Sequence, residues 1–187
     1  NFPLLKSSFP QQTKHLSAEQ FYKGINKIMP SLIRTEADEL TYHLHVMIRY
    51  EIEKLLIEGS IKTKDIPAYW NEHYQQYLGV AVPDDKRGCL QDIHWSHGSF
   101  GYFATYSLGS LYAAQFYAAI CKENESLEKE LASGNNESVL KWLQRNIYQY
   151  GRLKNSEDLC YDATGENLNT DYFIRYIKNK YYKIYSV

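Results

Sequence analysis

The scarcity of helix-breaking residues is the feature that most constrains the fold of this chain. Only 10 glycines and 5 prolines occur among 187 residues, and no segment keeps the strict apolar–polar alternation of a half-buried strand for long. Apolar residues recur instead at helical spacing, for example at Ile33, Ala37, Leu40, Leu44, Met47, Ile48 and Leu55. The sequence therefore predicts an all-α fold, and we interpret residues 1–187 as one helical domain.

Capping and breaking residues divide the chain into the expected helices. Ser17 is expected to start a helix that runs to about Met29, and a second helix is expected from Ser31 to Gly59. Further helices are predicted between Asp65 and Gly79, over about 101–121, and after Ser126, Asn136, Ser156 and Asn169. Residues 1–16 and 79–100 show no sustained period, so we expect irregular structure there.

Composition excludes several classes of protein. With 44% hydrophobic and 23% charged residues the chain can bury a core, which argues against disorder. A net charge of −1 argues against a general nucleic-acid or membrane-surface binder. The cysteines Cys89, Cys121 and Cys160 form no CxxC pair and indicate a reduced, cytoplasmic chain. Because the first residue is Asn1 rather than Met, we expect a piece of a longer protein.

The segment from Gly88 to Trp95, GCLQDIHW, carries the densest chemistry. Asp92 and His94 are two residues apart, so in an extended stretch Asp92 could fix the tautomer of His94 or hold it protonated. The alternative is a purely structural role, in which these residues form a buried polar network that closes a loop onto the core. A metal site of Asp92, His94 and His97 is a weaker alternative, because no fourth ligand is evident.

Two further positions have a structural and a functional interpretation. Arg34 lies four residues before Asp38, which is typical of a surface ion pair, but an Arg can also bind a carboxylate through two N–H groups. Tyr102 and Tyr106 are four residues apart at an expected helix start. They could line a helix–helix contact or face an anion or a developing oxyanion.

These segments together resemble one family. IRTEAD, from Ile33 to Asp38, resembles the IRxxAD motif, and GCLQDIHW resembles the GxxQDxHW motif, of the Taq-type zinc metallocarboxypeptidases. The likeness extends from about Phe9 to the C-terminus. The family's zinc-binding HExxH motif, which precedes IRxxAD, does not occur in this sequence. The chain therefore resembles the C-terminal part of such an enzyme, without its zinc site.

The resemblance implies a homodimeric enzyme that removes single residues from peptide C-termini with broad specificity, using zinc or another divalent metal. It implies a helical fold with a deep groove, to which this chain would contribute one wall. The expected substrate-binding residues are Arg34, Gln91 and Asp92, and the expected catalytic residues are His94, Tyr102 and Tyr106. We expect the chain to hold no metal, to bind neither nucleic acid nor membrane, and to be inactive alone. The alternative function is a non-catalytic helical interaction module.

Overall fold

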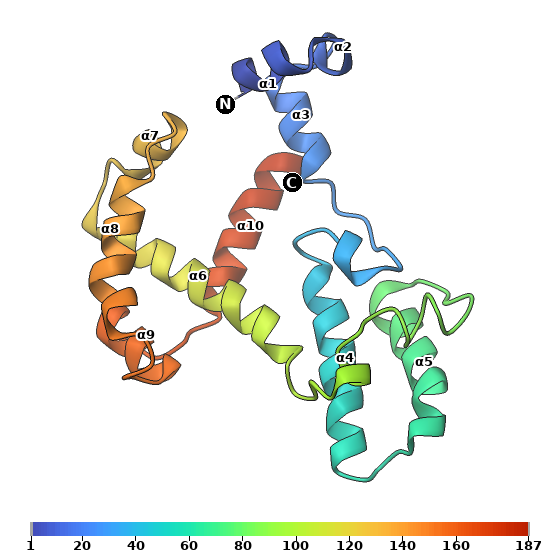
Figure 1. The fold of residues 1–187 in the computed structure, drawn as a ribbon. Helices are drawn as coiled ribbons and strands as arrows, with labels where there is room; N and C mark the ends of the chain where they lie inside the picture. Colours follow the sequence, from blue (N-terminus) through green and yellow to red (C-terminus); the bar gives the residue numbers. More distant parts are fainter. Residues whose placement is uncertain (1, 187) are drawn as a thin grey trace. The chain divides into compact units, whose positions relative to one another are not determined.

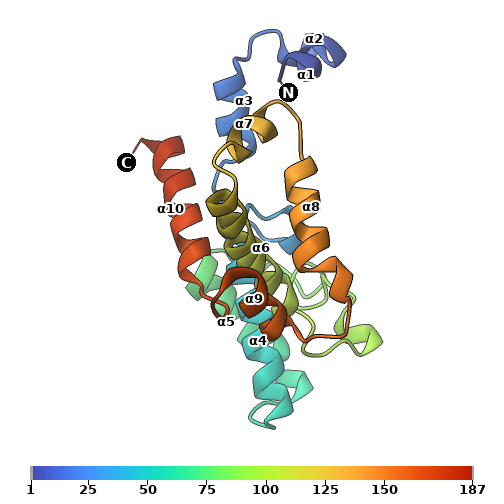
Figure 2. The same ribbon diagram turned by 90° about the vertical axis from the view of Figure 1, so that its left-hand side faces the viewer.

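The computed structural model describes residues 2–186, and these form helices and connecting segments without a strand (Figures 1 and 2). The α-helices are α1 Phe2–Ser8, α2 Pro10–Thr13, α3 Ala18–Ile25, α4 Tyr42–Ile57, α5 Ile66–Leu78, α6 Ala104–Glu123, α7 Leu127–Ala132, α8 Glu137–Asn146, α9 Ser156–Thr164 and α10 Asp171–Tyr185. Short 3-10 helices cover Arg34–Glu36, Thr63–Asp65, Trp95–His97 and Tyr148–Tyr150. The predicted all-α fold is confirmed.

Several helix ends lie where the sequence places them. Ser17 Oγ accepts from the backbone N–H of Gln20 at 3.1 Å, and Gln20 Oε1 accepts from the backbone N–H of Ser17 at 2.9 Å. This reciprocal pair is a capping box and fixes the start of α3. Helix α5 ends at Leu78 and is capped by Gly79, whose φ of 65° is in the left-handed region that a residue with a Cβ rarely adopts.

Two predictions about the N-terminal third are wrong. The expected irregular lead-in over residues 1–16 contains α1 and α2, and Pro10 opens α2 at a position where its missing N–H costs nothing. The helix expected from Ser31 begins only at Tyr42. Asp38 explains the delay, because its carboxylate accepts from the backbone N–H groups of Met29, Leu40 and Thr41. Such side-chain bonds to the backbone compete with helix formation.

The chain divides into two compact units, residues 22–108 and residues 1–21 together with 109–187. The interpretation of residues 1–187 as one domain stays a prediction. In the second unit, Gln115 of α6 is buried and joins α6 to the end of α9 and to the segment that follows it. Its Nε2 donates to Thr164 Oγ1 at 2.9 Å, and its Oε1 accepts from the Asn169 backbone N–H at 2.8 Å. Among residues 2–186, no helix is both long and apolar enough to cross a membrane.

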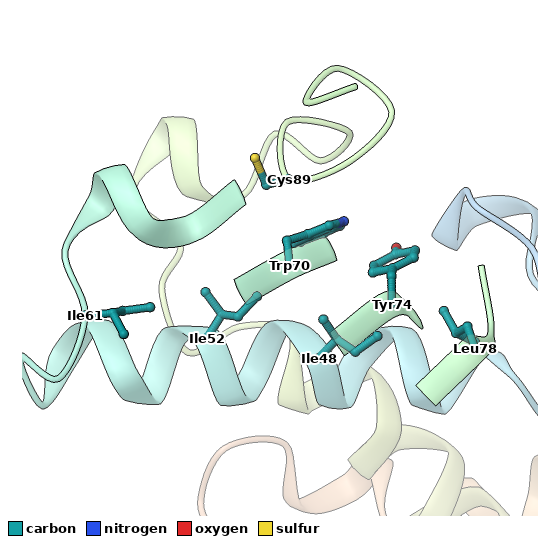
Figure 3. Packing of buried hydrophobic residues seen from close by; sticks show 7 residues of the cluster. All are labelled: Ile48, Ile52, Ile61, Trp70, Tyr74, Leu78 and Cys89. Carbon is teal, nitrogen blue, oxygen red and sulfur yellow. The ribbon is translucent and has the colours of Figure 1, made fainter. Parts of the chain in front are cut away.

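The core of residues 22–108 lies between α4 and α5 (Figure 3). Its buried members are Ile48, Ile52, Ile61, Trp70, Tyr74, Leu78 and Cys89. Trp70 stacks on Tyr74 with ring centroids 5.0 Å apart. Gly88 approaches this core closely, since an added Cβ would lie 2.7 Å from Val82 Cγ1 and 3.0 Å from the Asp84 carbonyl oxygen. The start of the GCLQDIHW segment therefore needs glycine to pass close to Val82 and Asp84 of the segment that follows α5.

Candidate functional site

Two arginines hold Asp92 from opposite sides, and we call Arg34, Arg49 and Asp92 the buried triad. Arg34 Nε and Nη2 donate to Asp92 Oδ1 at 3.0 and 2.7 Å, and Arg49 Nε donates to Oδ2 at 2.7 Å. The side chains of Arg34, Arg49 and Asp92 are 8%, 0% and 10% exposed. The alternative interpretation of Arg34 and Asp38 as a surface ion pair is therefore wrong, because Arg34 is buried and pairs with Asp92.

Gln91 fixes both arginines through one amide group. Its Oε1 accepts from the Arg34 backbone N–H at 2.9 Å and from Arg49 Nη2 at 2.8 Å. Its Nε2 donates to the backbone carbonyls of Leu32 and Arg87 at 3.2 and 2.8 Å. These four bonds use the full hydrogen-bonding capacity of the amide, so the Gln91 side chain orients Arg34 and has no group left for a ligand.

Aromatic rings enclose the two guanidinium groups. The Arg49 guanidinium lies 4.5 Å from the Trp70 ring centre and 5.3 Å from that of Phe103. The Arg34 guanidinium lies 5.6 Å from Phe103 and 5.1 Å from Tyr106. Cation–π contacts stabilise charges that are shielded from water, and the apolar walls strengthen the ion pairs inside them.

The buried triad carries one net positive charge, with two guanidinium groups and one carboxylate. Burial alone would raise the pKa of Asp92, but the hydrogen bonds and charges of Arg34 and Arg49 outweigh burial and lower it. Arg34 donates three hydrogen bonds, two to Asp92 and one from Nη1 to the Tyr42 hydroxyl at 2.9 Å. A guanidinium has five N–H groups, so two have no acceptor among the described residues and remain for a further one. This arrangement suits a ligand that carries a carboxylate.

His45 lies behind the triad as a neutral side chain. Its ring is fully buried, and Nδ1 lies 3.0 Å from the Tyr74 hydroxyl oxygen. Burial, followed by the positive charges of Arg49 and Arg34, lowers the pKa of His45 to about 4. His45 therefore adds no charge to the triad at neutral pH.

The depressed pKa of His45 predicts a loss of stability in mild acid. The unfolded chain protonates His45 near its ordinary pKa of 6.5, whereas the folded chain does so only at about 4. The unfolded state therefore binds more protons in this window, and the free energy of unfolding falls by about 3 kcal/mol from pH 6.5 to pH 4. Urea unfolding across this range should show a flatter pH dependence for His45→Gln than for the parent. Equal slopes would contradict the assignment.

His94, Tyr102 and Tyr106 form a partly exposed rim beside the triad. His94 Nε2 lies 3.0 Å from the Tyr106 hydroxyl oxygen, and the His94 ring lies 4.3 Å from the Phe103 ring centre. The Tyr102 ring lies 5.7 Å from His94 and 5.4 Å from Tyr106. Burial lowers the pKa of His94, the charge of Asp92 opposes this, and the charge of Arg34 adds to the lowering. The rim therefore places a neutral imidazole and two phenols at the edge of a positively charged cluster.

The expectation that Asp92 orients the His94 imidazole is wrong. Both oxygens of Asp92 accept from the two arginines, while the bonded nitrogen of His94 contacts Tyr106. The alternative of a metal site at Asp92, His94 and His97 is not supported either. In the part of the chain that the structure describes, no group of three or more His, Cys, Asp or Glu side chains could hold a metal ion.

Sequence reasoning missed Arg49, which is the most deeply buried member of the triad. A signal was present in the sequence, because His45, Arg49 and Glu53 follow one another at intervals of four. This spacing places three polar side chains on one stripe of a helix whose neighbouring stripe, Ile48 and Ile52, is apolar. A buried polar stripe of this kind requires partners from another segment. Here the partners are Tyr74, Asp92 and Trp95.

Comparison with known proteins defines the family. Residues 1–181 match the family described as Carboxypeptidase Taq (M32) metallopeptidase, and the chain belongs to this family. It is 42% identical to carboxypeptidase 1 of Bacillus subtilis over 181 residues. The aligned region covers 97% of this chain and 36% of the Bacillus protein. It is 42% identical over 170 residues to thermostable carboxypeptidase 1 of Thermus thermophilus, covering 91% of this chain and 33% of that protein.

Solved structures agree with the sequence comparison. The crystal structure of a carboxypeptidase of the same family from Deinococcus radiodurans matches with a TM-score of 0.96 and 37% identity, covering 100% of this chain and 38% of that chain. The chain thus spans about a third of the length of the relatives that it matches. The predicted resemblance to a part of a metallocarboxypeptidase is confirmed.

Proposed function

We propose that residues 22–108 supply the groups that bind the substrate's terminal carboxylate and the developing oxyanion in a metal-dependent carboxypeptidase. The observation that carries this proposal is the buried triad, which has one guanidinium more than carboxylate. Two N–H groups of Arg34 remain for an acceptor, and the His94–Tyr106 pair lies beside them. The substrate class is peptides with free C-termini, from which single residues are removed.

Each residue has a separate task in the proposal. Arg34 binds the terminal carboxylate, while Gln91 and Asp92 act as positioning residues because their polar atoms are occupied by protein partners. The hydrogen-bonded pair of His94 and Tyr106 can supply one donor to the carbonyl oxygen as it gains negative charge, and Tyr102 borders the same space. Donors held in place before the reaction stabilise the transition state without reorganisation.

The metal of the proposed enzyme is zinc or another divalent ion. The described residues of this chain do not fit a metal centre, because no suitable ligand group is present among them, and a catalytic zinc site needs three protein ligands. We therefore propose that the metal is held outside these residues and that the chain alone is inactive. Calorimetric titration of the chain with zinc should show no tight binding. Tight binding that is lost in His94→Ala and His97→Ala would contradict this.

Cytoplasmic location and homodimer formation remain predictions for the complete enzyme. The alternative function is a non-catalytic helical interaction module. The assembled triad and rim favour the enzyme, because an interaction module would gain nothing from a buried cluster with excess positive charge, which is costly to maintain.

The experiment that tests the proposal is Arg34→Lys in the full-length enzyme. Lys keeps the charge but loses the planar fork that matches a carboxylate. If Arg34 acts on ground-state binding, KM for a peptide with a free C-terminus rises while kcat changes little. Steady-state kinetics at constant metal concentration measures both values. An unchanged KM would remove Arg34 from the substrate site.

A further inference from the structure

We propose that Glu53 is a positioning residue that clamps the segment between His94 and Tyr102. This rests on the proposed function, since it concerns how the rim is held. Glu53 is 3% exposed, and its Oε1 accepts from Trp95 Nε1 at 2.8 Å. The backbone N–H of Gly101 lies close enough to the same carboxylate to lower its pKa. Glu53 thus binds Trp95, the residue after His94, and its carboxylate neighbours Gly101, the residue before Tyr102.

The clamp connects the rim to the same helix that carries part of the triad. Glu53 lies one helical turn after Arg49 on α4. A single rigid helix therefore sets both Arg49, which holds Asp92, and the anchor of the loop that carries His94. Sites built on regular elements hold their geometry more tightly than sites on unsupported loops.

Aromatic packing turns the bond to Trp95 into a rigid support. The Trp95 ring lies nearly parallel to Phe100, with centroids 6.2 Å apart and an interplanar angle of 7°. It meets Trp70 and Phe103 edge-on at 6.0 and 6.2 Å. Phe103 in turn contacts the His94 ring. Moving Trp95 would therefore move the surface against which the imidazole packs.

The free-energy cost of burying the Glu53 carboxyl group also indicates that this side chain does more than fill space in the core. Burial raises the pKa of Glu53, whereas the hydrogen bond from Trp95 and the neighbouring backbone N–H of Gly101 lower it. Its Oε2 has no hydrogen-bond partner among the described residues. A buried carboxyl group with neutral donors and an unsatisfied oxygen costs more than an apolar side chain of the same size. Such a group is expected where position matters more than stability.

Two variants of similar length separate the hydrogen bond from the packing. Glu53→Gln keeps an acceptor oxygen for Trp95 and Gly101, whereas Glu53→Met removes it. In the 187-residue chain, amide hydrogen exchange over residues 95–101 should increase in Glu53→Met and stay near the parent value in Glu53→Gln. Trp95→Phe removes the donor instead and should resemble Glu53→Met, so the test does not depend on one variant folding.

Kinetics of the full-length enzyme give the second readout. Glu53→Met should lower kcat about ten- to a hundredfold, because small displacements of positioned groups have effects of this size. KM should change little, since Arg34 keeps its own partners, and Glu53→Gln should stay close to the parent. Parental exchange and turnover in Glu53→Met, or equal damage in both variants, would overturn the clamp. If His94→Ala and Tyr106→Phe keep full turnover, the proposed function fails, while the exchange result still decides the clamp.

Discussion

Asp92→Ala is expected to destabilise residues 22–108 by about 3–5 kcal/mol, the cost of leaving a buried charge without its partner. The carboxylate accepts from both arginines, whose side chains are 8% and 0% exposed, so its removal leaves two guanidinium groups facing each other away from water. Urea unfolding at neutral pH measures the loss. It should grow smaller at low pH, where protonation of Asp92 weakens the parent itself.

The chain offers a matched control for this prediction. Asp84 forms an ion pair with Arg87 at 2.5 Å, but the two side chains are 43% and 57% exposed. Exposed pairs contribute little because water and salt screen them, so Asp84→Ala should leave the unfolding midpoint nearly unchanged. If both variants unfold at the same urea concentration as the parent, the triad is not the buried cluster with excess positive charge described above.

Tyr106→Phe is expected to lower kcat of the full-length enzyme about 10²–10³-fold, as removal of an oxyanion donor does. The substitution removes only the hydroxyl group that lies 3.0 Å from His94 Nε2 and keeps the ring that contacts Arg34. His94→Ala should show a similar fall in kcat. Tyr50→Phe is the matched control, because Tyr50 is a half-exposed tyrosine of α4 that is not one of the rim residues.

Melting temperature separates a catalytic role from a structural one. The account predicts that Tyr106→Phe melts close to the parent and loses turnover while folded. A purely structural role predicts the reverse, with early melting and normal turnover per folded molecule. That second result would assign His94 and Tyr106 to the packing of the loop.

Local patterns predicted most of the helices. Apolar spacing and caps identified α5 and its end at Gly79, and Ser17 identified the start of α3. The missing information lay in contacts distant in sequence. Asp38 appeared to be a helical partner of Arg34, but it folds the segment before α4 by binding the backbone of Met29 and Thr41. A single polar side chain that binds the backbone and so competes with helix formation does not change the spacing of the apolar residues. The pattern of apolar residues therefore could not predict it.

The sequence predicted which residues belong to the candidate site, but it did not predict which of them bind one another. The segment GCLQDIHW indicated that Gln91, Asp92 and His94 belong together, and the structure places them in one cluster with Arg34. The two-residue spacing suggested that Asp92 orients the imidazole of His94, but the Asp92 carboxylate binds Arg34 and Arg49 instead. Arg49 decides this outcome, because a second guanidinium from α4 takes the remaining oxygen of Asp92.

The most direct test compares two peptides that differ only in a free carboxylate or an amide at the C-terminus, using the full-length enzyme and its Arg34→Lys variant. The account predicts that the parent strongly prefers the free acid in kcat/KM and that Arg34→Lys loses most of this preference, because the two N–H groups left by Asp92 and Tyr42 no longer face the carboxylate. If Arg34→Lys keeps the full preference for the acid, the buried triad does not recognise the peptide's C-terminus.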